Sequence, residues 1–331
     1  MKNMHTIVID TKGSDKGPKM AIKGAALALE RYENLAICLV GDKDFIECEC
    51  KALNMPMDRV EIVNAPGEIT NYDSPATALF EKPDSSLCVS LSLLRDREDL
   101  TGLICAGSTG ALLAGSMRYL SGKERVRPAL AAVLPSENGS FTCLVDTGAT
   151  IDCTPQMLLH FARLGSDFMR RLYRLESPKI GLLSNGAEST KGNKLVKETH
   201  TLLIEADDLN FIGNIEGTGA LSGKCDVLVC DGFAGNQVLK VSEGIARRII
   251  TDIVKYSKAT NQPQLMELVG HLMGIYDFNS LGGGIILGTE KPVIKAHGAA
   301  NEMSIVNTAG MLLNIAENKE IFDMGRTKEN G

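Results

Sequence analysis

The stretch that decides the fold runs from residue 102 to residue 115 and reads Gly102-Leu-Ile-Cys-Ala-Gly-Ser-Thr-Gly-Ala-Leu-Leu-Ala-Gly115. Its apolar residues 103–106 are typical of a short buried strand, and the residues from Ala111 onward are good helix formers. Between them, residues 107–110 turn the chain and offer backbone amides, two hydroxyls and the positive end of a helix dipole. Such a turn suits an anion, and it equally suits an ordinary strand-to-helix connection capped by Ser or Thr.

Short apolar strands alternate with helical runs along the whole chain, and this alternation predicts an α/β fold. The expected architecture is a mostly parallel sheet sandwiched by helices, since strands covered on both faces need continuous apolar runs. We predict a single α/β domain over residues 1–331, with excursions from the core at residues 53–84 and 256–281. The predicted strands cover residues 6–10, 35–40, 60–63, 103–106, 129–134, 141–145, 179–183, 226–230 and 292–296.

Helices are predicted from apolar residues at helical spacing and from the residues that begin a helix. Pro18 stands where a helix start tolerates a missing N–H, and Ser85 stands where a helix cap is expected. Residues 64–84 contain three prolines and are interpreted mostly as loop, and residues 256–280 as less regular. The predicted helices cover residues 20–31, 86–95, 155–173, 194–206 and 304–317, and further helices follow the turns at residues 41–42, 107–110 and 231–236.

Composition and charge exclude several classes of protein. The chain has 331 residues and a net charge of −6, which disfavours a broad nucleic-acid-binding surface. It has no apolar run of about 20 residues and a polar start, so we expect neither a membrane span nor a signal peptide. Nine scattered cysteines without a paired C-x-x-C spacing fit reduced thiols used as small core residues, and hence a cytoplasmic protein.

Five apolar strands end in polar turns that contain glycine. The carboxyl ends of parallel strands meet at one edge of a sheet, where open α/β folds bind their ligands. Five such turns at one edge predict a site for phosphate or a ligand that carries phosphate. The turns are Asp10…Gly13-Ser14-Asp15, Gly107-Ser108-Thr109-Gly110, Asp146-Thr147-Gly148, Asn185-Gly186…Lys191-Gly192-Asn193 and Asp231-Gly232…Gly235-Asn236.

Several familiar catalytic motifs are missing from the sequence. There is no G-x-x-x-x-G-K-[ST] phosphate loop, no G-x-G-x-x-G after the first strand, no G-x-S-x-G elbow and no H-E-x-x-H. The aspartates at the strand ends could hold a metal ion, but Asp in these positions more often serves as a turn or cap residue. We therefore expect no metal and no cofactor.

Two residues with functional side chains stand out among the turns. Lys191 lies in a glycine-flanked loop beside Asn193, which fits a fixed charge near an oxyanion, although most single lysines are surface residues. His297 follows a strand and is the best candidate for a functional histidine, and it could equally cap the final helix.

Four stretches of the chain resemble one family. Cys105-Ala-Gly-Ser-Thr-Gly-Ala-Leu-Leu, Arg127-Pro-Ala-Leu-Ala, Asn210-Phe-Ile-Gly-Asn-Ile-Glu-Gly and Cys230-Asp-Gly-Phe-Ala-Gly-Asn236 look like bacterial acyl-[acyl-carrier-protein]:phosphate acyltransferases. Leu-Lys240, Gly282-Gly283 and Lys295-Ala-His-Gly298 match as well, and the resemblance runs from Thr6 to about Ala316.

The resemblance implies a homodimeric α/β enzyme related to phosphotransacetylases and isocitrate dehydrogenase. Its partners would be acyl carrier protein, which donates a fatty acyl group, and inorganic phosphate, which accepts it, for phospholipid synthesis. We assign Lys191 and Asn236 as catalytic residues. With the turns above, the phosphate- and acyl-binding candidates are Gly13, Ser14, Asp15, Gly107, Ser108, Thr109, Gly110, Asn193, Asn214, Glu216, Asp231, Lys240 and His297.

The chain departs from the family pattern at several turns. It has Asp10-Thr-Lys-Gly-Ser-Asp15 where the family usually has Asp-Ala-Met-Gly-Gly-Asp, and Ser108 where the family has Asn. These changes support an alternative, a diverged paralogue that binds an acyl or phosphate ligand without turnover. A second alternative, a metal-dependent decarboxylating dehydrogenase, would need helical D-x-x-x-D carboxylates, which the sequence lacks.

Residues 264–278 carry a further expectation. Leu265, Leu268, Val269, Leu272 and Ile275 fall at helical spacing. An exposed helix of this kind can lie in a membrane interface, as the resemblance implies, or its apolar face can pack against a dimer partner or the core.

Overall fold

The computed structural model describes residues 4–122, 127–276, 283–298 and 300–317. The chain forms two compact units. Unit 1 comprises Met1–Ala129 and Leu281–Gly331, and unit 2 comprises Leu130–Ser280. Unit 1 is therefore built from the two ends of the chain, and unit 2 from one continuous segment. The interpretation of the whole chain as a single domain stays a prediction.

Unit 1 contains strands in the order β3-β2-β1-β4-β11-β10. All neighbouring pairs from β3 to β11 are parallel, and β10 is antiparallel to β11. These strands are β1 (His5–Asp10), β2 (Leu35–Gly41), β3 (Val60–Asn64), β4 (Leu100–Cys105), β10 (Gly284–Leu287) and β11 (Val293–Lys295). The edge formed by the carboxyl ends of β1, β4 and β11 is therefore common to three polar turns.

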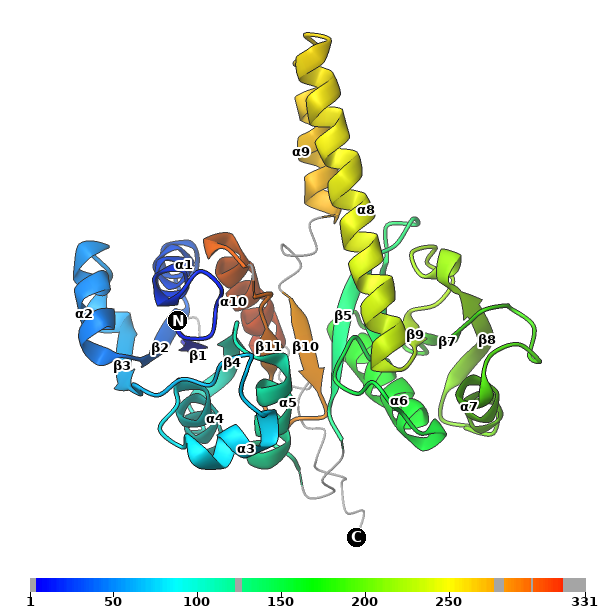
Figure 1. The fold of residues 1–331 in the computed structure, drawn as a ribbon, viewed down its shortest axis with the longest axis horizontal. Helices are drawn as coiled ribbons and strands as arrows, with labels where there is room; N and C mark the ends of the chain where they lie inside the picture. Colours follow the sequence, from blue (N-terminus) through cyan, green and yellow to red (C-terminus); the bar gives the residue numbers. More distant parts are fainter. Residues whose placement is uncertain (1–3, 123–126, 277–282, 299, 318–331) are drawn as a thin grey trace. The chain divides into compact units, whose positions relative to one another are not determined.

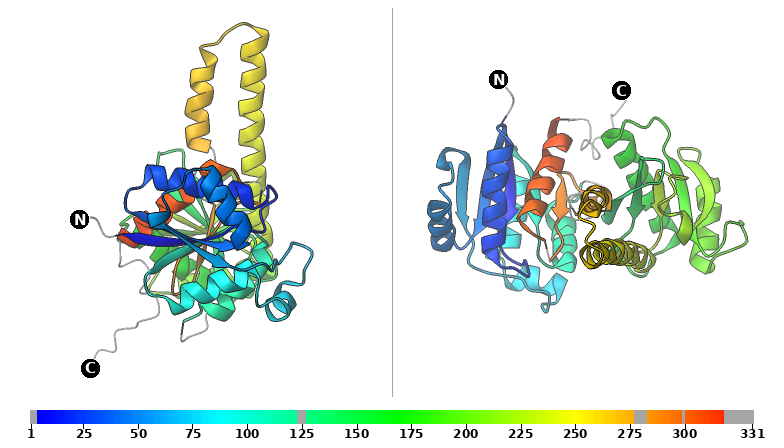
Figure 2. Two further views of the ribbon diagram at one scale, coloured as in Figure 1. Left: turned by 90° about the vertical axis from the view of Figure 1, so that its left-hand side faces the viewer. Right: turned by 90° about the horizontal axis from the view of Figure 1, so that it is seen from above.

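Helices cover both faces of the unit 1 sheet (Figures 1 and 2). Helices α1 and α10 pack side by side on one face, and α4 contacts β1, β2 and β4 on the other. The helices of unit 1 are α1 (Pro18–Arg31), α2 (Lys43–Ala52), α3 (Pro75–Glu81), α4 (Ser86–Asp96), α5 (Thr109–Tyr119) and α10 (Glu302–Glu317). Because both faces are covered, the strands consist largely of fully buried apolar residues.

Unit 2 contains strands in the order β5-β6-β9-β7-β8. The pair β5–β6 is antiparallel, and the pairs β6–β9, β9–β7 and β7–β8 are parallel. These strands are β5 (Ala129–Pro135), β6 (Phe141–Val145), β7 (Lys179–Ser184), β8 (Asn210–Glu216) and β9 (Val227–Val229). The helices are α6 (Pro155–Leu172), α7 (Lys194–Ile204), α8 (Gly232–Ala259) and α9 (Leu265–Tyr276).

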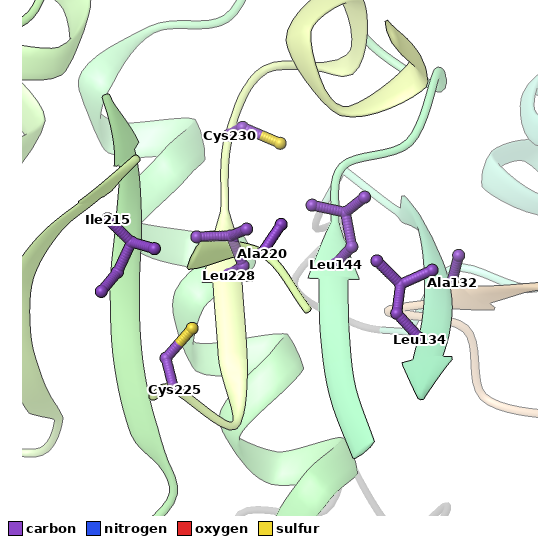
Figure 3. Packing of buried hydrophobic residues seen from close by; sticks show 8 residues of the cluster. All are labelled: Ala132, Leu134, Leu144, Ile215, Ala220, Cys225, Leu228 and Cys230. Carbon is purple, nitrogen blue, oxygen red and sulfur yellow. The ribbon is translucent and has the colours of Figure 1, made fainter. Parts of the chain in front are cut away.

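Successive residues of β9 pack on opposite faces of the sheet. Leu228 joins a buried cluster (Figure 3), and Ala234 and Val238 of α8 pack against this cluster. Its neighbour Val227 lies against α6, where a Cβ on Gly165 would be only 2.6 Å from Val227 Cγ1. This alternation explains why a strand of only three residues is apolar throughout.

The C-terminal part of α8 and the whole of α9 project together as an antiparallel helical hairpin (Figures 1 and 2). Residues 256–276 of the predicted excursion at residues 256–281 belong to this hairpin, residues 277–281 fall outside the described part, and the excursion itself stays a prediction. Residues 265–276 are helical rather than irregular, as their apolar spacing indicated.

The predicted strands and helices agree with the structure to within a few residues, with three exceptions. Residues 210–216 form β8, although no strand was predicted there. The loop interpretation of residues 64–84 missed α3, a helix with Pro75 at its first position. No strand was expected at β10, because a four-residue run behind a series of glycines is too short to show a period. The prediction of a mostly parallel sheet flanked by helices is confirmed.

Candidate active site

In unit 1, the turns that follow β1 and β4 touch each other through glycines. A Cβ on Gly13 would lie 2.6 Å from Gly107 Cα, and Gly13 has a φ of 79°. Any side chain at Gly13 would therefore both collide and strain the backbone. The glycines bring the backbones of the two turns together at the edge of the sheet.

The turn that follows β11 joins the same place. The Asp15 amide donates a hydrogen bond to the Gly298 carbonyl at 3.1 Å, and Ser14 Oγ donates to that carbonyl at 3.5 Å. A Cβ on Gly298 would lie 2.9 Å from an oxygen of the Asp15 carboxylate. The predicted residues Ser14 and Asp15 thus lie beside the turn that holds His297, whose side chain is exposed.

Helix α5 begins at this edge. Ser108 caps it, with Oγ accepting a hydrogen bond from the Ala111 amide at 3.5 Å. Thr109 is the first helical residue and is half-buried, while Gly110 is exposed next to Pro75 of α3. The first turn of α5 directs its backbone amides toward the edge, an arrangement that favours an anion.

Three buried polar side chains lie beneath these turns. Cys105 Sγ donates to Asp10 Oδ2 at 3.3 Å and accepts from the Gly107 amide at 3.3 Å. Lys295 Nζ donates to the Ala106 carbonyl at 3.2 Å and to the Ala296 carbonyl. The hydrogen bonds of Asp10, Cys105 and Lys295 connect the ends of β1, β4 and β11.

Burial raises the pKa of Asp10 to about 6, although hydrogen bonds from Ser86, Lys12 and Cys105 oppose the rise. Burial, and then the nearby Asp10 charge, raises the pKa of Cys105 well above its ordinary value. The Cys105 sulfur is therefore a protonated thiol at neutral pH. A protonated, buried thiol is a poor nucleophile.

In unit 2, Asp146 anchors the turn that follows β6. Its fully buried carboxylate accepts hydrogen bonds from the amides of Leu130 at 3.1 Å, Gly148 at 3.2 Å, Ala149 at 3.0 Å and Thr150 at 2.6 Å. Burial raises the pKa of Asp146, and these amides act in the opposite direction. Both carboxylate oxygens are occupied by backbone donors, which fits a turn anchor better than a metal ligand.

Asn236 lies against the same turn. Its Nδ2 donates to the Thr147 carbonyl at 3.2 Å, and a Cβ on Gly148 would be 3.3 Å from that nitrogen. Asn236 is the fifth residue of α8, one turn beyond the helix start that Asp231 caps. Lys240 is exposed one further turn along, and its Nζ lies 2.8 Å from Glu243 Oε2.

The loop that follows β7 presents Lys191. The Gly192 amide donates to Asn185 Oδ1 at 2.8 Å, and Gly192 has a φ of 98°. The exposed Lys191 lies over Gly186, where a Cβ would be 2.6 Å from Lys191 Cγ. The Gly186 position therefore leaves room for the lysine side chain to lie across the loop.

Strand β8 holds this loop from beneath. Asn214 is buried, and its Nδ2 donates to the Glu188 carbonyl at 2.8 Å. Glu216 is exposed at the end of β8 and pairs in register with Ser184 of β7. Asn214 therefore supports the loop that carries Lys191, and Glu216 stands at its border.

A pocket of about 400 Å³ opens at this edge of unit 2. The N-terminal ends of two helices meet there. Asn193 caps α7 by accepting from the Val196 amide at 2.9 Å, and Asp231 caps α8 by accepting from the Ala234 amide at 2.8 Å. The lining residues are Leu158, Leu182, Leu183, Ser184, Asn185, Gly192, Asn193, Val196, Cys230, Asp231 and Ala234.

The predicted site residues fall into one group in each unit. Gly13, Ser14, Asp15, Gly107, Ser108, Thr109, Gly110 and His297 belong to unit 1, and Lys191, Asn193, Asn214, Glu216, Asp231, Asn236 and Lys240 belong to unit 2. The pocket brings Asn193 and Asp231 together, whereas Lys191 and Asn236 are not among its lining residues. Within the described ranges, no three His, Cys, Asp or Glu side chains gather closely enough to hold a metal ion.

Two polar residues near the candidate site were not predicted from the sequence. Lys295 was noted only as part of a motif, and the signal that it is buried is its place directly after Val293-Ile294 at the end of an apolar strand. Ser184 at the end of β7 carried no signal, and its Oγ is buried without a hydrogen-bond partner among the described residues.

The family model and the similar proteins of known name point to the same family. A family model described as "Fatty acid synthesis protein" matches residues 5–319. Phosphate acyltransferase from Halothermothrix orenii is 39% identical over 311 residues, which cover 91% of this chain and 92% of that protein. Phosphate acyltransferase from Thermoanaerobacter pseudethanolicus is 37% identical, covering 96% of this chain and 98% of that protein.

The fold has a counterpart among solved structures. A phosphotransacetylase from Streptococcus pyogenes superposes with a TM-score of 0.64 at 18% sequence identity, covering 96% of this chain and 95% of that chain. At this identity the likeness concerns the fold. It confirms the expected relation to the phosphotransacetylase fold.

Proposed function

Because the chain belongs to the fatty acid synthesis protein family, we propose that it is an enzyme that transfers a fatty acyl group to inorganic phosphate. The donor would be the thioester of acyl carrier protein, and the acyl phosphate product would serve phospholipid synthesis. The observation that carries the proposal is the set of polar, glycine-containing turns at the carboxyl ends of parallel strands in each unit. The names of the relatives favour neither alternative, that is, neither the diverged paralogue that binds its ligand without turnover nor the metal-dependent dehydrogenase.

The proposed reaction needs no covalent intermediate on the enzyme. A phosphate oxygen attacks the thioester carbonyl carbon and forms a C–O bond, and the carbonyl oxygen becomes an oxyanion. The C–S bond then breaks, and the leaving sulfur takes up the proton that hydrogen phosphate gives up, which releases the thiol. Lys191, exposed on its loop, would neutralise the phosphate or the oxyanion, and Asn236 Nδ2 would donate to it. Within unit 1, the backbone amides of residues 107–110 and of the turn that follows β1 form a separate candidate site for an anion, as helix starts do.

Buried thiols support the absence of an acyl-enzyme. Cys230 is 3% exposed, and burial, followed by the Asp231 and Asp146 charges, raises its pKa well above the ordinary value. Together with Cys105, it is therefore a poor nucleophile. Free, buried thiols such as Cys38 and Cys143 also fit the reducing environment of the cytoplasm, which is where we propose that the enzyme works.

We further propose that the enzyme is a homodimer. Helix α8 carries Val241, Ile245 and Ile249 at intervals of four residues, and these side chains are more than half exposed. An apolar stripe at helical spacing on a projecting hairpin is suited to cover a second copy of itself.

A peripheral membrane contact through residues 264–278 is the last part of the proposal. In α9, Val269 is buried, Leu265 and Leu272 are half-buried, and Leu268 and Ile275 are exposed. Part of the predicted stripe therefore packs inward, and the rest is available to a membrane surface. Separately, no helix among the described residues is long and apolar enough to cross a membrane.

Mass spectrometry of the products tests the proposed activity. Acyl carrier protein thioesters of several chain lengths are supplied with phosphate, and the appearance of acyl phosphate with release of free thiol is expected. If every thioester stays intact although the protein binds it, the protein is instead the diverged paralogue that binds an acyl ligand without turnover.

A further inference from the structure

The pocket in unit 2 has apolar walls and a polar mouth. Leu158, Leu182 and Cys230 are at most 3% exposed and form its inner wall. Asn185 and Asn193, which are exposed, stand with the Asp231 carboxylate where β7 and β9 end. Polarity thus changes along the pocket from hydrogen-bonding groups outside to hydrocarbon inside.

This gradient suits a chain of methylene groups better than a phosphate ion. The residues that line the pocket include no lysine, arginine or histidine, and one of them is a carboxylate, which repels anions. A phosphate inside would lose its hydration, and the two helix starts at the pocket offer little compensation because the side chains of Asn193 and Asp231 already cap them. Each methylene group buried there would instead gain hydrophobic and dispersion energy.

We propose that this pocket binds the alkyl chain of the acyl donor and that Ala234 sets the length of chain it accepts. The inference rests on the proposed function for the identity of the substrate. The carbonyl end of the substrate would remain at the polar mouth, beside the loop that carries Lys191. The apolar end would extend toward Leu158 and Leu182.

Ala234 lines the pocket with a small side chain. It lies in the first turn of α8, and its amide donates a hydrogen bond to the Asp231 side chain. Its half-buried side chain lines the pocket and packs against the buried cluster of the sheet. A methyl group leaves space that a larger side chain would fill. Ala234→Leu would add three carbon atoms to this wall without removing a hydrogen bond.

Ser184 provides an independent sign of a ligand. It lines the pocket, and its buried Oγ has no hydrogen-bond partner among the described residues. A buried hydroxyl without a partner is unfavourable, and the carbonyl oxygen of a bound acyl group could accept its hydrogen bond. Ser184→Ala is then expected to lower kcat/KM for all chain lengths alike.

The central experiment compares kcat/KM for 8-carbon and 16-carbon acyl carrier protein thioesters in Ala234→Leu and in wild type. Each methylene group excluded from the pocket changes binding by a factor of about four, so loss of room for three is expected to lower the 16-carbon value on the order of 50-fold. The 8-carbon value should change less than about threefold. Ala246→Leu, on the same helix, half-buried and outside the pocket, is the matched control.

A binding measurement separates the pocket from the reaction. Wild type should bind the fluorescent fatty acid cis-parinaric acid, Ala234→Leu should bind it more weakly, and Ala246→Leu should not differ from wild type. If wild type binds this probe in an Ala234-dependent way but makes no acyl phosphate, the pocket assignment holds and the proposed function fails.

Two results would overturn the assignment of the pocket while leaving the proposed function intact. One is an equal loss of kcat/KM for both chain lengths in Ala234→Leu. The other is a raised KM for phosphate without a change in chain-length preference, which would place phosphate in the pocket. If Ala234→Leu fails to fold by circular dichroism, Val196→Phe narrows the pocket from α7 and is subject to the same criteria.

Discussion

Single residues hold the two catalytic candidates in place by different means. Lys191 is an exposed side chain over a glycine, whereas Asn236 is tied to the Thr147 carbonyl. We expect Lys191→Ala and Asn236→Ala each to lower acyl transfer by about 10²-fold or more, the effect of removing one oxyanion donor. Product formation by mass spectrometry and the melting temperature, which should change little, are the two measurements.

Matched controls exist for both changes. Lys194 is an exposed lysine three residues along, and Asn210 Nδ2 donates to the Ser177 carbonyl at 3.1 Å, much as Asn236 does to Thr147. Lys194→Ala and Asn210→Ala should retain wild-type rates. Rates near wild type in the Lys191 and Asn236 variants would show that the site has been assigned to the wrong residues.

Asp10 should make the stability of the protein depend on pH. Its pKa rises from 3.8 to about 6 on folding because of burial, so the folded state holds a proton that the unfolded state releases between these values. The free energy of unfolding therefore falls as pH rises from about 4 to 6, by on the order of 3 kcal/mol for this group. The free energy of unfolding of Asp10→Asn should not show this part of the decrease.

Urea unfolding of wild type and Asp10→Asn at pH 4.5 and pH 7 measures the effect. The stability of the variant relative to wild type should increase between the two pH values. Asp44→Asn, an exposed acid in the first turn of α2, should follow wild type. Parallel curves for Asp10→Asn and wild type would mean that the Asp10 carboxyl titrates normally in the folded protein.

At the scale of elements, the α8–α9 hairpin carries several exposed apolar side chains, among them Ile245, Leu268 and Ile275. We expect Leu268→Glu with Ile275→Glu to abolish co-sedimentation with phospholipid vesicles, because both side chains are exposed on α9 and a charge there opposes insertion. Binding by wild type should depend little on salt, since Glu267 and His271 replace the basic residues that anionic lipids attract.

The control for the hairpin is Gln264→Glu with His271→Glu, which adds charge at exposed polar positions. These changes should leave binding largely intact. Sedimentation velocity of both double variants distinguishes the remaining possibility: if Leu268→Glu with Ile275→Glu makes the protein monomeric or aggregated, the stripe is structural and does not bind the membrane.

At the scale of the whole molecule, unit 1 depends on the return of the chain after unit 2. Strand β11 pairs with β4, α10 packs on α1, and a Cβ on Gly102 would be 2.8 Å from Leu312 Cδ2. Deletion of residues 281–331 removes these partners and exposes the apolar residues of β4 and α1. We expect the deleted protein to lose cooperative unfolding of unit 1 and to retain that of the continuous unit 2.

Differential scanning calorimetry measures this result. Deletion of residues 318–331 leaves every described element intact and serves as the control. Calorimetry of the full chain also tests the single-domain interpretation, which expects one transition; two separate transitions would contradict it. Cooperative unfolding of unit 1 without residues 281–331 would show that the α1–β4 region is stable alone.

The sequence by itself determined the kinds of element and the places where chemistry could occur. Apolar runs identified most strands, and caps such as Ser85, Asn193 and Asp231 are side-chain acceptors that act within three residues of their own position. Such signals are local, because helix caps, strand periods and turn glycines depend on neighbours along the chain. Short elements such as β10 gave too few residues for a period to show.

Only the tertiary structure decided how these residues meet. Asn236 donates a hydrogen bond to the Thr147 carbonyl, 89 residues away in the sequence. Cys105 donates to Asp10, 95 residues away, and Lys295 donates to the Ala106 carbonyl, 189 residues away. Such pairs follow from strand order and register, which bring distant segments together and which no local pattern encodes. The residues that line the pocket come from α6, β7, α7 and α8. For the same reason the pocket could not be predicted from the sequence, although nearly every turn at its mouth was predicted.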